Sequence, residues 1–306
     1  MAVAKGKVIL LGEHAVVYGR PALVVGIDNG AEATVSVDGS CSITVGETTA
    51  RPGEGELGTA FSALMSSLNT PPLQAKIDLR IPAGCGLGAS AAAAVALARA
   101  ALDMLEPSAS ETPARRQRIL SAAEAWEKVF HGHPSGVDAT AAILGGCFVF
   151  SRGHPLEIVD PATPLHLAVA VADAPANTRE MVAQVAERYQ DDKIRVDEIF
   201  DRITALVRSS QSALLSGPVA ELGPLMNENQ LLLRELGVST PRLDLACNVA
   251  LDAGALGAKL TGSGGGGCVV ALCQVHLEPV LSAWRTLGLV CISATIARQE
   301  PVASDV

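Results

Sequence analysis

Aromatic residues are scarce in this chain: they make up 3% of its 306 residues, so no aromatic stack for a purine base is evident. Basic residues are also few, since 23 Lys and Arg stand against 32 Asp and Glu, which gives a net charge of −9. Such a balance gives no electrostatic support to a nucleic-acid or anionic-membrane partner. We therefore expect a protein that binds neither nucleic acid nor a membrane.

The seven cysteines include no C-x-x-C pair, and no His/Cys cluster has zinc spacing. Their odd number and the apolar neighbours of Cys147, Cys268 and Cys273 indicate reduced thiols and a cytoplasmic protein. A signal peptide is not expected, because the apolar run Val8–Leu11 is too short for its hydrophobic region. The Ala-rich run over residues 91–105 is short and carries charges, which favours a buried helix over a membrane span.

Apolar residues make up 49% of the chain and charged residues 18%, which is ample for a buried core. The stretch over residues 153–164 is rich in Pro and turn residues, which indicates a boundary between two domains, 1–162 and 163–306. Strand and helix patterns are mixed along both parts, so the predicted fold class is α+β.

One segment combines a strand, a glycine-rich loop and a helix. Residues 75–81 alternate apolar and polar side chains, as a half-buried strand does, and a helix is predicted over 91–105. The backbone N–H groups of the loop and the positive end of the helix dipole would meet at one point, which is a ready site for a phosphate. The loop between them, called here the phosphate loop, consists of Pro82, Ala83, Gly84, Cys85, Gly86, Leu87, Gly88, Ala89 and Ser90.

Three other interpretations of this segment are possible from the sequence. A tight turn before a core helix is the plain alternative. A dinucleotide site would fit G-x-G-x-x-A over residues 84–89, but it requires a second strand ending in an acidic residue. Residues 106–113 instead form a loop that leads into another helix. A Walker loop is excluded because no Gly-Lys-Ser/Thr follows the glycines.

Two further stretches are turn-rich, Gly12–Pro21 and Phe130–Asp138, and a third, 262–267, matches G-x-G-x-x-G although a strand follows it. The remaining predicted strands are 8–11, 22–27, 31–37, 145–150, 165–172, 268–272 and 290–296. The remaining predicted helices are 58–68, 115–129, 139–144, 178–190, 194–214, 217–235, 239–255 and 277–287.

Three separated segments together resemble the motifs of the GHMP kinase superfamily, and of its mevalonate kinases in particular. The first is Lys7-Val-Ile-Leu-Leu-Gly-Glu13-His14-Ala-Val-Val-Tyr-Gly19. The second, His131-Gly-His133-Pro-Ser-Gly-Val-Asp138, resembles the family's H-G-x-P-S-G-x-D. The third, Lys259-Leu-Thr261-Gly-Ser-Gly-Gly-Gly-Gly-Cys268, resembles its C-terminal glycine motif. The matches are spread over most of the chain, which makes chance agreement improbable.

The resemblance implies a two-domain fold with a ribosomal-S5-like N-terminal domain and a ferredoxin-like C-terminal domain. It implies ATP-dependent phosphorylation of the 5-hydroxyl of mevalonate, in isoprenoid biosynthesis, with magnesium. Phosphoryl transfer needs positioning and charge neutralisation more than covalent chemistry. By motif position, the resemblance gives each residue a role: Asp138 as catalytic base, Lys7 as the group that neutralises it, Ser90 and Glu127 as magnesium ligands, and Glu13, His14 and Thr261 at the substrate.

These roles require Lys7 and Asp138 to lie together near the start of the 91–105 helix. Taken singly, Lys7 would be a solvated strand flank, Glu127 a helix-surface charge and Asp138 an N-cap.

The chain also departs from the family: Ala89 replaces the first of two usual serines, and Ser263 replaces a usual alanine. The alternatives are another superfamily kinase (phosphomevalonate, homoserine or sugar), a nucleotide-binding regulator without catalysis, or an oxidoreductase. Because related kinases are often dimers, a homodimer is one assembly to test.

Overall fold

The computed structural model describes residues 1–37, 39–107, 109–132 and 134–296, which form two compact units. The first unit comprises Met1–Lys7, Asp28–Ala83 and Gly88–Gly145. The second comprises Val8–Ile27, Gly84–Leu87 and the chain from Gly146 onward. Strands β1 (Ala2–Leu11) and β2 (Ala22–Ser36) each have residues in both units, and so does the phosphate loop. The division at residue 162 stays a prediction.

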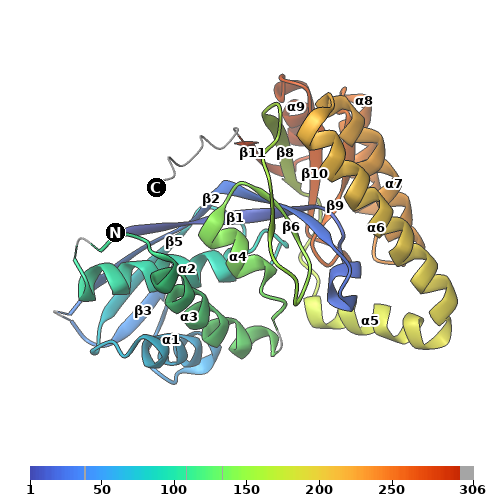
Figure 1. The fold of residues 1–306 in the computed structure, drawn as a ribbon. Coiled ribbons are helices and arrows are strands. Elements are labelled where there is room, and N and C mark those ends of the chain that lie inside the picture. The colour runs from blue at the N-terminus through green and yellow to red at the C-terminus, as the bar shows by residue number, and fades with distance from the viewer. Residues whose placement is uncertain (38, 108, 133, 297–306) are drawn as a thin grey trace, which may run out of the picture. The chain divides into compact units, whose positions relative to one another are not determined.

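Sheet pairing in the first unit follows the alternation of apolar and polar side chains. Residues 31–36 of β2 pair antiparallel with β5, and β3 pairs parallel with β5 and antiparallel with β4. On β5, Ala75 and Ile77 are buried while the alternate residues Gln74, Lys76 and Asp78 are exposed, as the predicted strand requires. The strands of this part of the sheet are β3 (Ser42–Val45), β4 (Thr48–Ala50) and β5 (Gln74–Leu79) (Figure 1).

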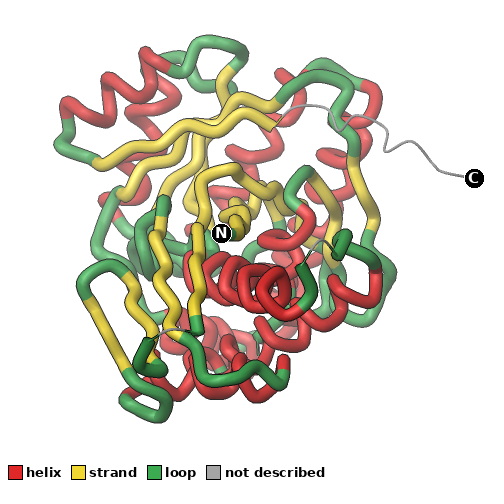
Figure 2. Tube along the Cα trace, turned by 90° about the vertical axis from the view of Figure 1, so that its left-hand side faces the viewer, coloured by secondary structure: helices red, strands yellow, loops and turns green. Residues whose placement is uncertain are grey.

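Helices cover one face of these strands, and the core of the first unit lies between the two layers (Figure 2). The central helix is buried on nearly every side, because its alanine methyl groups allow close approach by its neighbours. Trp126 and Phe61 fill the wider gaps. The four helices are α1 (Gly55–Leu68), α2 (Ala89–Leu105), α3 (Pro113–His131) and α4 (Val137–Leu144).

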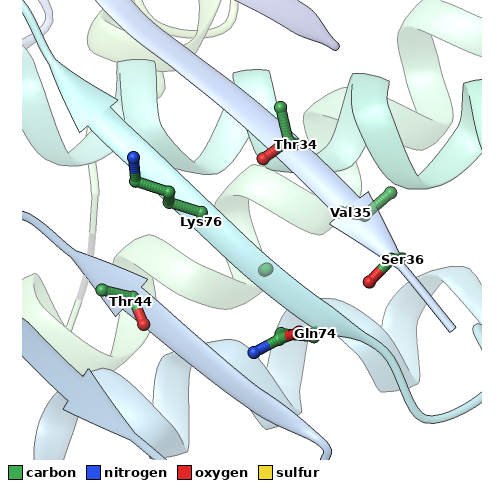
Figure 3. Close-up of a pocket in the computed structure, with 7 residues that line it drawn as sticks. Thr34, Val35, Ser36, Thr44, Gln74 and Lys76 are labelled. Atoms are coloured by element: carbon green, nitrogen blue, oxygen red, sulfur yellow. The ribbon is translucent and has the colours of Figure 1, made fainter. Parts of the chain in front are cut away.

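The opposite face of the same strands is polar. Thr34, Thr44, Gln74 and Lys76 line a pocket on it, and Figure 3 shows their side chains along β2, β5 and β3. This face continues the exposed half of the alternating pattern, so the strands need only one covering layer of helices.

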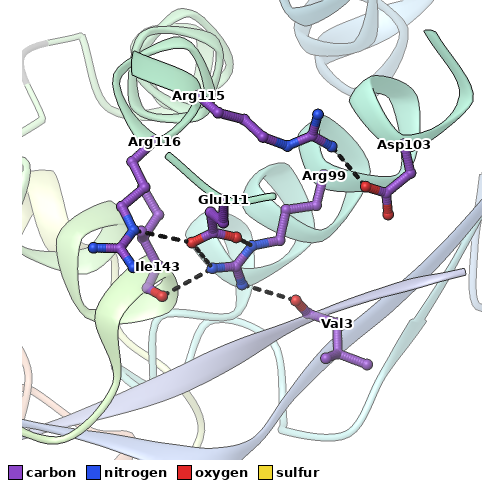
Figure 4. A network of polar contacts seen from close by, with 7 residues as sticks. All are labelled: Val3, Arg99, Asp103, Glu111, Arg115, Arg116 and Ile143. Atoms are coloured by element: carbon purple, nitrogen blue, oxygen red, sulfur yellow. Dashed lines mark hydrogen bonds and ion pairs between the residues drawn. The ribbon is translucent and has the colours of Figure 1, made fainter. Parts of the chain in front are cut away.

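Arg99 joins the helices of the first unit to its first strand, as Figure 4 shows. Its guanidinium donates to both carboxylate oxygens of Glu111, at 2.8 and 2.9 Å. It also donates to the backbone oxygens of Val3 and Ile143, each at 2.9 Å. Bidentate pairing of this kind fixes geometry as well as charge. The charge inside the Ala-rich segment therefore anchors α2 between β1 and the end of α4.

The C-terminal part of the second unit has the strand and helix order βαββαβ. Its antiparallel sheet has the order β11-β8-β10-β9, which is a ferredoxin-like arrangement. Residues 22–25 of β2 pair with β6, and β6 pairs with β7, within the same unit. The elements are β6 (Cys147–Phe150), β7 (Glu157–Val159), β8 (Leu165–Val171), α5 (Thr178–Asp191), α6 (Lys193–Ser216), α7 (Leu222–Glu235), α8 (Pro241–Asp252), β9 (Gly257–Thr261), β10 (Cys268–Cys273), α9 (Glu278–Thr286) and β11 (Val290–Ile296).

Two glycines allow α7 to lie directly against β9. A Cβ atom added to Gly223 would lie 2.2 Å from the backbone oxygen of Leu256, and one added to Gly257 would lie 2.4 Å from the backbone oxygen of Gly223. Real side chains would push the helix away. This close approach brings the polar side chains of α7 to the strand that carries Lys259 and Thr261.

The predicted α+β class is confirmed, and the predicted helices and most predicted strands are present with shifted ends. Segments 22–27 and 31–37 are wrong as separate strands, because β2 is continuous through Gly30. The strands β3, β4, β7 and β9 were not predicted. Three of them have three or four residues, too few to show a period, and β9 is short and buried at every residue.

Gly12–Pro21 contains a short 3-10 helix, Ala15–Tyr18. In the part of the chain that the structure describes, no helix has the length and apolarity needed to cross a membrane.

Candidate active site

An ion pair between Lys7 and Asp138 lies at the centre of the first unit's polar groups. Lys7 Nζ lies 3.1 Å from Asp138 Oδ1. The lysine side chain is 5% exposed and the aspartate 34%, so the pair opens to solvent on the aspartate side. Asp138 stands in the first turn of α4, where the helix dipole favours a negative charge. The predicted proximity of these two residues is confirmed.

The start of α2 lies against the same lysine. The helix begins after Gly88, whose φ of +75° suits glycine and few other residues. A Cβ atom at this position would lie 3.0 Å from Lys7 Cγ. Gly88 therefore permits both the sharp turn and the close packing of the aliphatic part of the Lys7 side chain against the start of the helix. The predicted proximity of Lys7 to the start of this helix is also confirmed.

Ser90 and Glu127 are joined by a short hydrogen bond near the same helix start. Ser90 Oγ donates to Glu127 Oε1 at 2.5 Å, and Trp126 Nε1 donates to Ser90 Oγ at 3.1 Å. His131 Nε2 lies 3.8 Å from Glu127 Oε2, one turn further along α3. Trp126, which also belongs to the core of the first unit, thus orients the hydroxyl of Ser90.

Burial raises the pKa of the Glu127 carboxyl to about 7, and the negative charge of Asp138 acts in the same direction. The hydrogen bond from Ser90 and the positive charge of Lys7 oppose this rise in pKa. The buried carboxylate is therefore short of positive charge. A divalent cation would supply it, since a bound ion favours the deprotonated ligand.

The oxygen atoms of Ser90 and Glu127 fit Mg²⁺. This ion prefers hard oxygen ligands and takes one or two carboxylates, with phosphates and water completing its shell. Among the described residues, no group of three or more His, Cys, Asp or Glu could hold a metal ion. A site of one hydroxyl and one carboxylate suits an ion that arrives with a nucleotide.

A second polar group, in the second unit, is built around the buried ion pair of Glu13 and Lys259. Both side chains are 0% exposed, and Lys259 Nζ donates to Glu13 Oε1. Asn229 Nδ2 donates to Glu13 Oε2 at 3.2 Å. The carboxylate of Glu13 is thus engaged inside the protein, while its role at the substrate stays a prediction.

His14 and Thr261 flank this buried pair. His14 has a φ of +61°, an uncommon backbone conformation for a residue other than glycine, and its Nε2 lies 2.9 Å from the backbone oxygen of Ser263. Burial lowers the pKa of His14, which favours the neutral imidazole. Thr261 Oγ1 accepts from the Ile9 amide at 3.1 Å and donates to the Ile9 oxygen at 3.2 Å. The Glu13–Lys259 pair fixes the chain directly before His14 and two residues before Thr261.

The two departures from the family pattern have different surroundings. Ala89 is buried at the first position of α2, and Ser90 makes the polar contacts there. The hydroxyl of Ser263 lies 3.4 Å from that of Thr178, at the start of α5. His133 of the second motif lies outside the described residues.

Sequence reasoning missed Lys259 and Asn229 as members of the second polar group. Lys259 was quoted within a motif but given no role, although a lysine in a short strand whose other residues are apolar or small needs a partner. Asn229 stands on the buried side of α7 with Leu222, Met226 and Leu233. A buried amide in such a position indicates a polar partner inside the protein.

Two family models match the chain. The model described as GHMP kinases N terminal domain matches residues 56–146, and the model described as GHMP kinases C terminal matches residues 210–288. The first match contains Ser90, Glu127 and Asp138, and the second contains Asn229, Lys259 and Thr261.

Curated proteins similar to the chain over nearly its whole length are mevalonate kinases. That of Methanothermobacter thermautotrophicus is 35% identical, over 94% of this chain and 95% of that protein. That of Pyrococcus horikoshii is 32% identical, over 98% and 96%. Among solved structures, L. major mevalonate kinase in complex with R-mevalonate superposes with a TM-score of 0.86 at 28% identity, and the match covers 97% of this chain and 95% of that one.

The raised pKa of Glu127 predicts a stability that falls as pH rises. Between the ordinary value of 4.5 and about 7, the folded state keeps a proton that the unfolded state has released. At about pH 8 without magnesium, the buried charge should therefore cost the folded state roughly 3 kcal/mol.

We expect Glu127→Gln to raise the urea midpoint at about pH 8 in the presence of a chelator, and to raise it much less at about pH 5.5. Glu124→Gln, on the same helix, controls for the loss of a carboxylate from α3. An equal effect of Glu127→Gln at both pH values would contradict the account.

The buried ion pair predicts a large loss of stability when one partner is removed. We expect Lys259→Met to lower the free energy of unfolding by about 3–5 kcal/mol, because it leaves the Glu13 carboxylate buried beside Asn229 without a cation. The double variant Glu13→Leu/Lys259→Met should recover most of this loss in urea titrations. Lys76→Met, at an exposed position, is the control. A loss below about 1 kcal/mol for Lys259→Met would show that the pair is not buried as described.

Proposed function

The chain belongs to the GHMP kinase family, and we propose that it is a mevalonate kinase, which transfers the γ-phosphoryl group of ATP to the 5-hydroxyl of mevalonate. The product, 5-phosphomevalonate, belongs to the mevalonate pathway of isoprenoid biosynthesis. Full-length similarity to curated mevalonate kinases supports the substrate. The observation that carries the chemistry is the Lys7–Asp138 ion pair beside the start of α2.

The phosphate loop, Pro82–Ser90, binds the phosphates of ATP through its backbone N–H groups. Gly84, Gly86 and Gly88 all have positive φ, which turns successive amides without a side chain in the way. The positive end of α2 adds a favourable field for the negative charge of the phosphates. This loop therefore attracts the phosphates without a Walker lysine.

Ser90 and Glu127, whose oxygen atoms lie 2.5 Å apart in their hydrogen bond, would hold magnesium. When bound there, the ion would supply positive charge toward the phosphates. Trp126 keeps Ser90 oriented through its own hydrogen bond to Oγ. Burial of Glu127 keeps this carboxylate away from bulk water, which strengthens its attraction for a cation.

Asp138 is the catalytic base, because its partly exposed carboxylate can accept the proton of an alcohol. Lys7 stabilises the negative charge that develops on the attacking oxygen, and it holds the carboxylate in place through the 3.1 Å contact. His14 and Thr261 bind the acceptor, with His14 kept neutral by burial. A cytoplasmic location and a homodimer stay predictions.

A coupled assay of ADP release tests the proposed acceptor. The purified chain should turn over ATP with mevalonate, and far more slowly with phosphomevalonate, homoserine or galactose. Full activity with one of the other acceptors and none with mevalonate would assign the chain to a different branch of the family.

Asp138→Asn should reduce kcat by about a hundredfold or more, because the amide cannot accept the hydroxyl proton. The affinity for ATP should change little, since the base acts in the chemical step. Kinetics and nucleotide titration measure the two quantities, and Asp28→Asn, at an exposed position of the same unit, is the control. A kcat close to that of the parent chain would show that Asp138 is not the base.

A further inference from the structure

The phosphate loop and the C-terminal glycine loop (residues 262–267) touch backbone to backbone within the second unit. A Cβ atom on Gly86 would lie 2.9 Å from the backbone oxygen of Thr261, and one on Gly262 would lie 2.9 Å from Gly86 Cα. A Cβ atom on Gly267 would lie 3.4 Å from the oxygen of Cys85 and 3.7 Å from its Cα. The two loops therefore run side by side over several residues.

A cysteine from each loop region meets the other at this contact. Cys85 lies in the phosphate loop, and Cys268 is the first residue of β10, directly after the C-terminal glycine loop. Both side chains are buried, and the two thiols are hydrogen-bonded to each other. Neither residue belongs to a disulfide.

The two thiols differ in reactivity. The hydrogen bond from Cys268 lowers the pKa of Cys85, which favours the thiolate form of Cys85. The hydrogen bond to Cys85 and burial raise the pKa of Cys268. Burial alone raises the pKa of Cys273 to about 11 and that of Cys147 to about 12. Because the thiolate is the nucleophile, Cys85 is the reactive member of the pair.

We propose that Cys85 and Cys268 are a redox modification site: oxidation joins them in a disulfide that cross-links the phosphate loop to the C-terminal glycine loop and switches off nucleotide use. The bond itself depends only on the contact between the two loops. Its consequence for activity rests on the proposed kinase function.

Hydrogen peroxide would oxidise the pair in two steps. The Cys85 thiolate attacks one peroxide oxygen, which breaks the O–O bond, gives a sulfenic acid and releases one water molecule after protonation. The sulfur of Cys268 then attacks the sulfur of that sulfenic acid, and the second oxygen leaves as water. Two thiols lose two hydrogen atoms in total, and one peroxide becomes two water molecules. A dithiol such as dithiothreitol reverses the change by thiol–disulfide exchange.

The bond should impair the phosphate loop because it draws the loop backbone toward β10. A disulfide holds its sulfur atoms at about 2.05 Å, much closer than two hydrogen-bonded thiols lie. Gly84 and Gly86, on either side of Cys85, give the loop backbone the freedom to move. Displacing amides that position a reacting phosphate by about 1 Å can cost about a hundredfold in rate.

In the test, the reduced protein is treated with hydrogen peroxide and its remaining free thiols are then blocked. Its tryptic peptides are mapped by mass spectrometry. We expect a linked pair of peptides carrying Cys85 and Cys268, and a loss of kcat/KM for ATP of at least about tenfold that dithiothreitol restores. Each variant is compared with its own untreated sample. Cys268→Ala should lose little activity on treatment, whereas Cys273→Ala, altered at the other end of β10, should respond as the parent chain does.

Absence of the linked peptides, or an equal loss of activity in treated Cys268→Ala, would overturn the proposal. A loss that dithiothreitol does not restore would do the same, because it would show irreversible oxidation of a single thiol. The peptide map does not depend on turnover. A reduced protein without activity on mevalonate would therefore refute the proposed function and leave the disulfide testable.

Discussion

The ion pair between Lys7 and Asp138 is the interaction on which the rest of the site depends. It joins β1 to the first turn of α4, and Gly88 lets the start of α2 approach the same lysine. A buried ammonium needs a carboxylate partner, and the partner here is 34% exposed, so its carboxylate stays accessible from solvent. Under the proposed function, this one contact would provide both the charge neutralisation and the proton acceptor that phosphoryl transfer requires of a protein.

A second buried pair, Glu13 with Lys259, plays a structural part in the other unit. It holds the segments that carry His14 and Thr261, and the strained backbone of His14 persists because these contacts determine it from both sides. The two ion pairs differ in their exposure. The wholly buried pair can orient neighbouring residues, whereas the partly exposed pair can take part in proton transfer.

Much of the site could be predicted from the sequence because its parts are short motifs with strong local geometry. The strand, glycine loop and helix around Gly88 follow from periodicity and from the backbone freedom of glycine. The proximity of Lys7 to Asp138 followed from the family resemblance, since the two residues are 131 positions apart and no local pattern joins them. Local patterns indicate that Lys259 and Asn229 need polar partners, but their pairing with Glu13 could not be predicted, because it depends on α7 lying against β9. Short strands such as β3 and β4 were not predicted for a related reason. They are defined by pairing with neighbouring strands and not by a sequence period.

The central claim is that Lys7 and Asp138 act as one catalytic unit, and a double-mutant cycle on kcat with ATP and mevalonate tests it most directly. We predict that Lys7→Met/Asp138→Asn loses little more activity than the more damaging single change, because removing either residue already disables the pair. Losses that multiply, so that the double variant falls by the product of the two single effects, would contradict the account and show two independent groups.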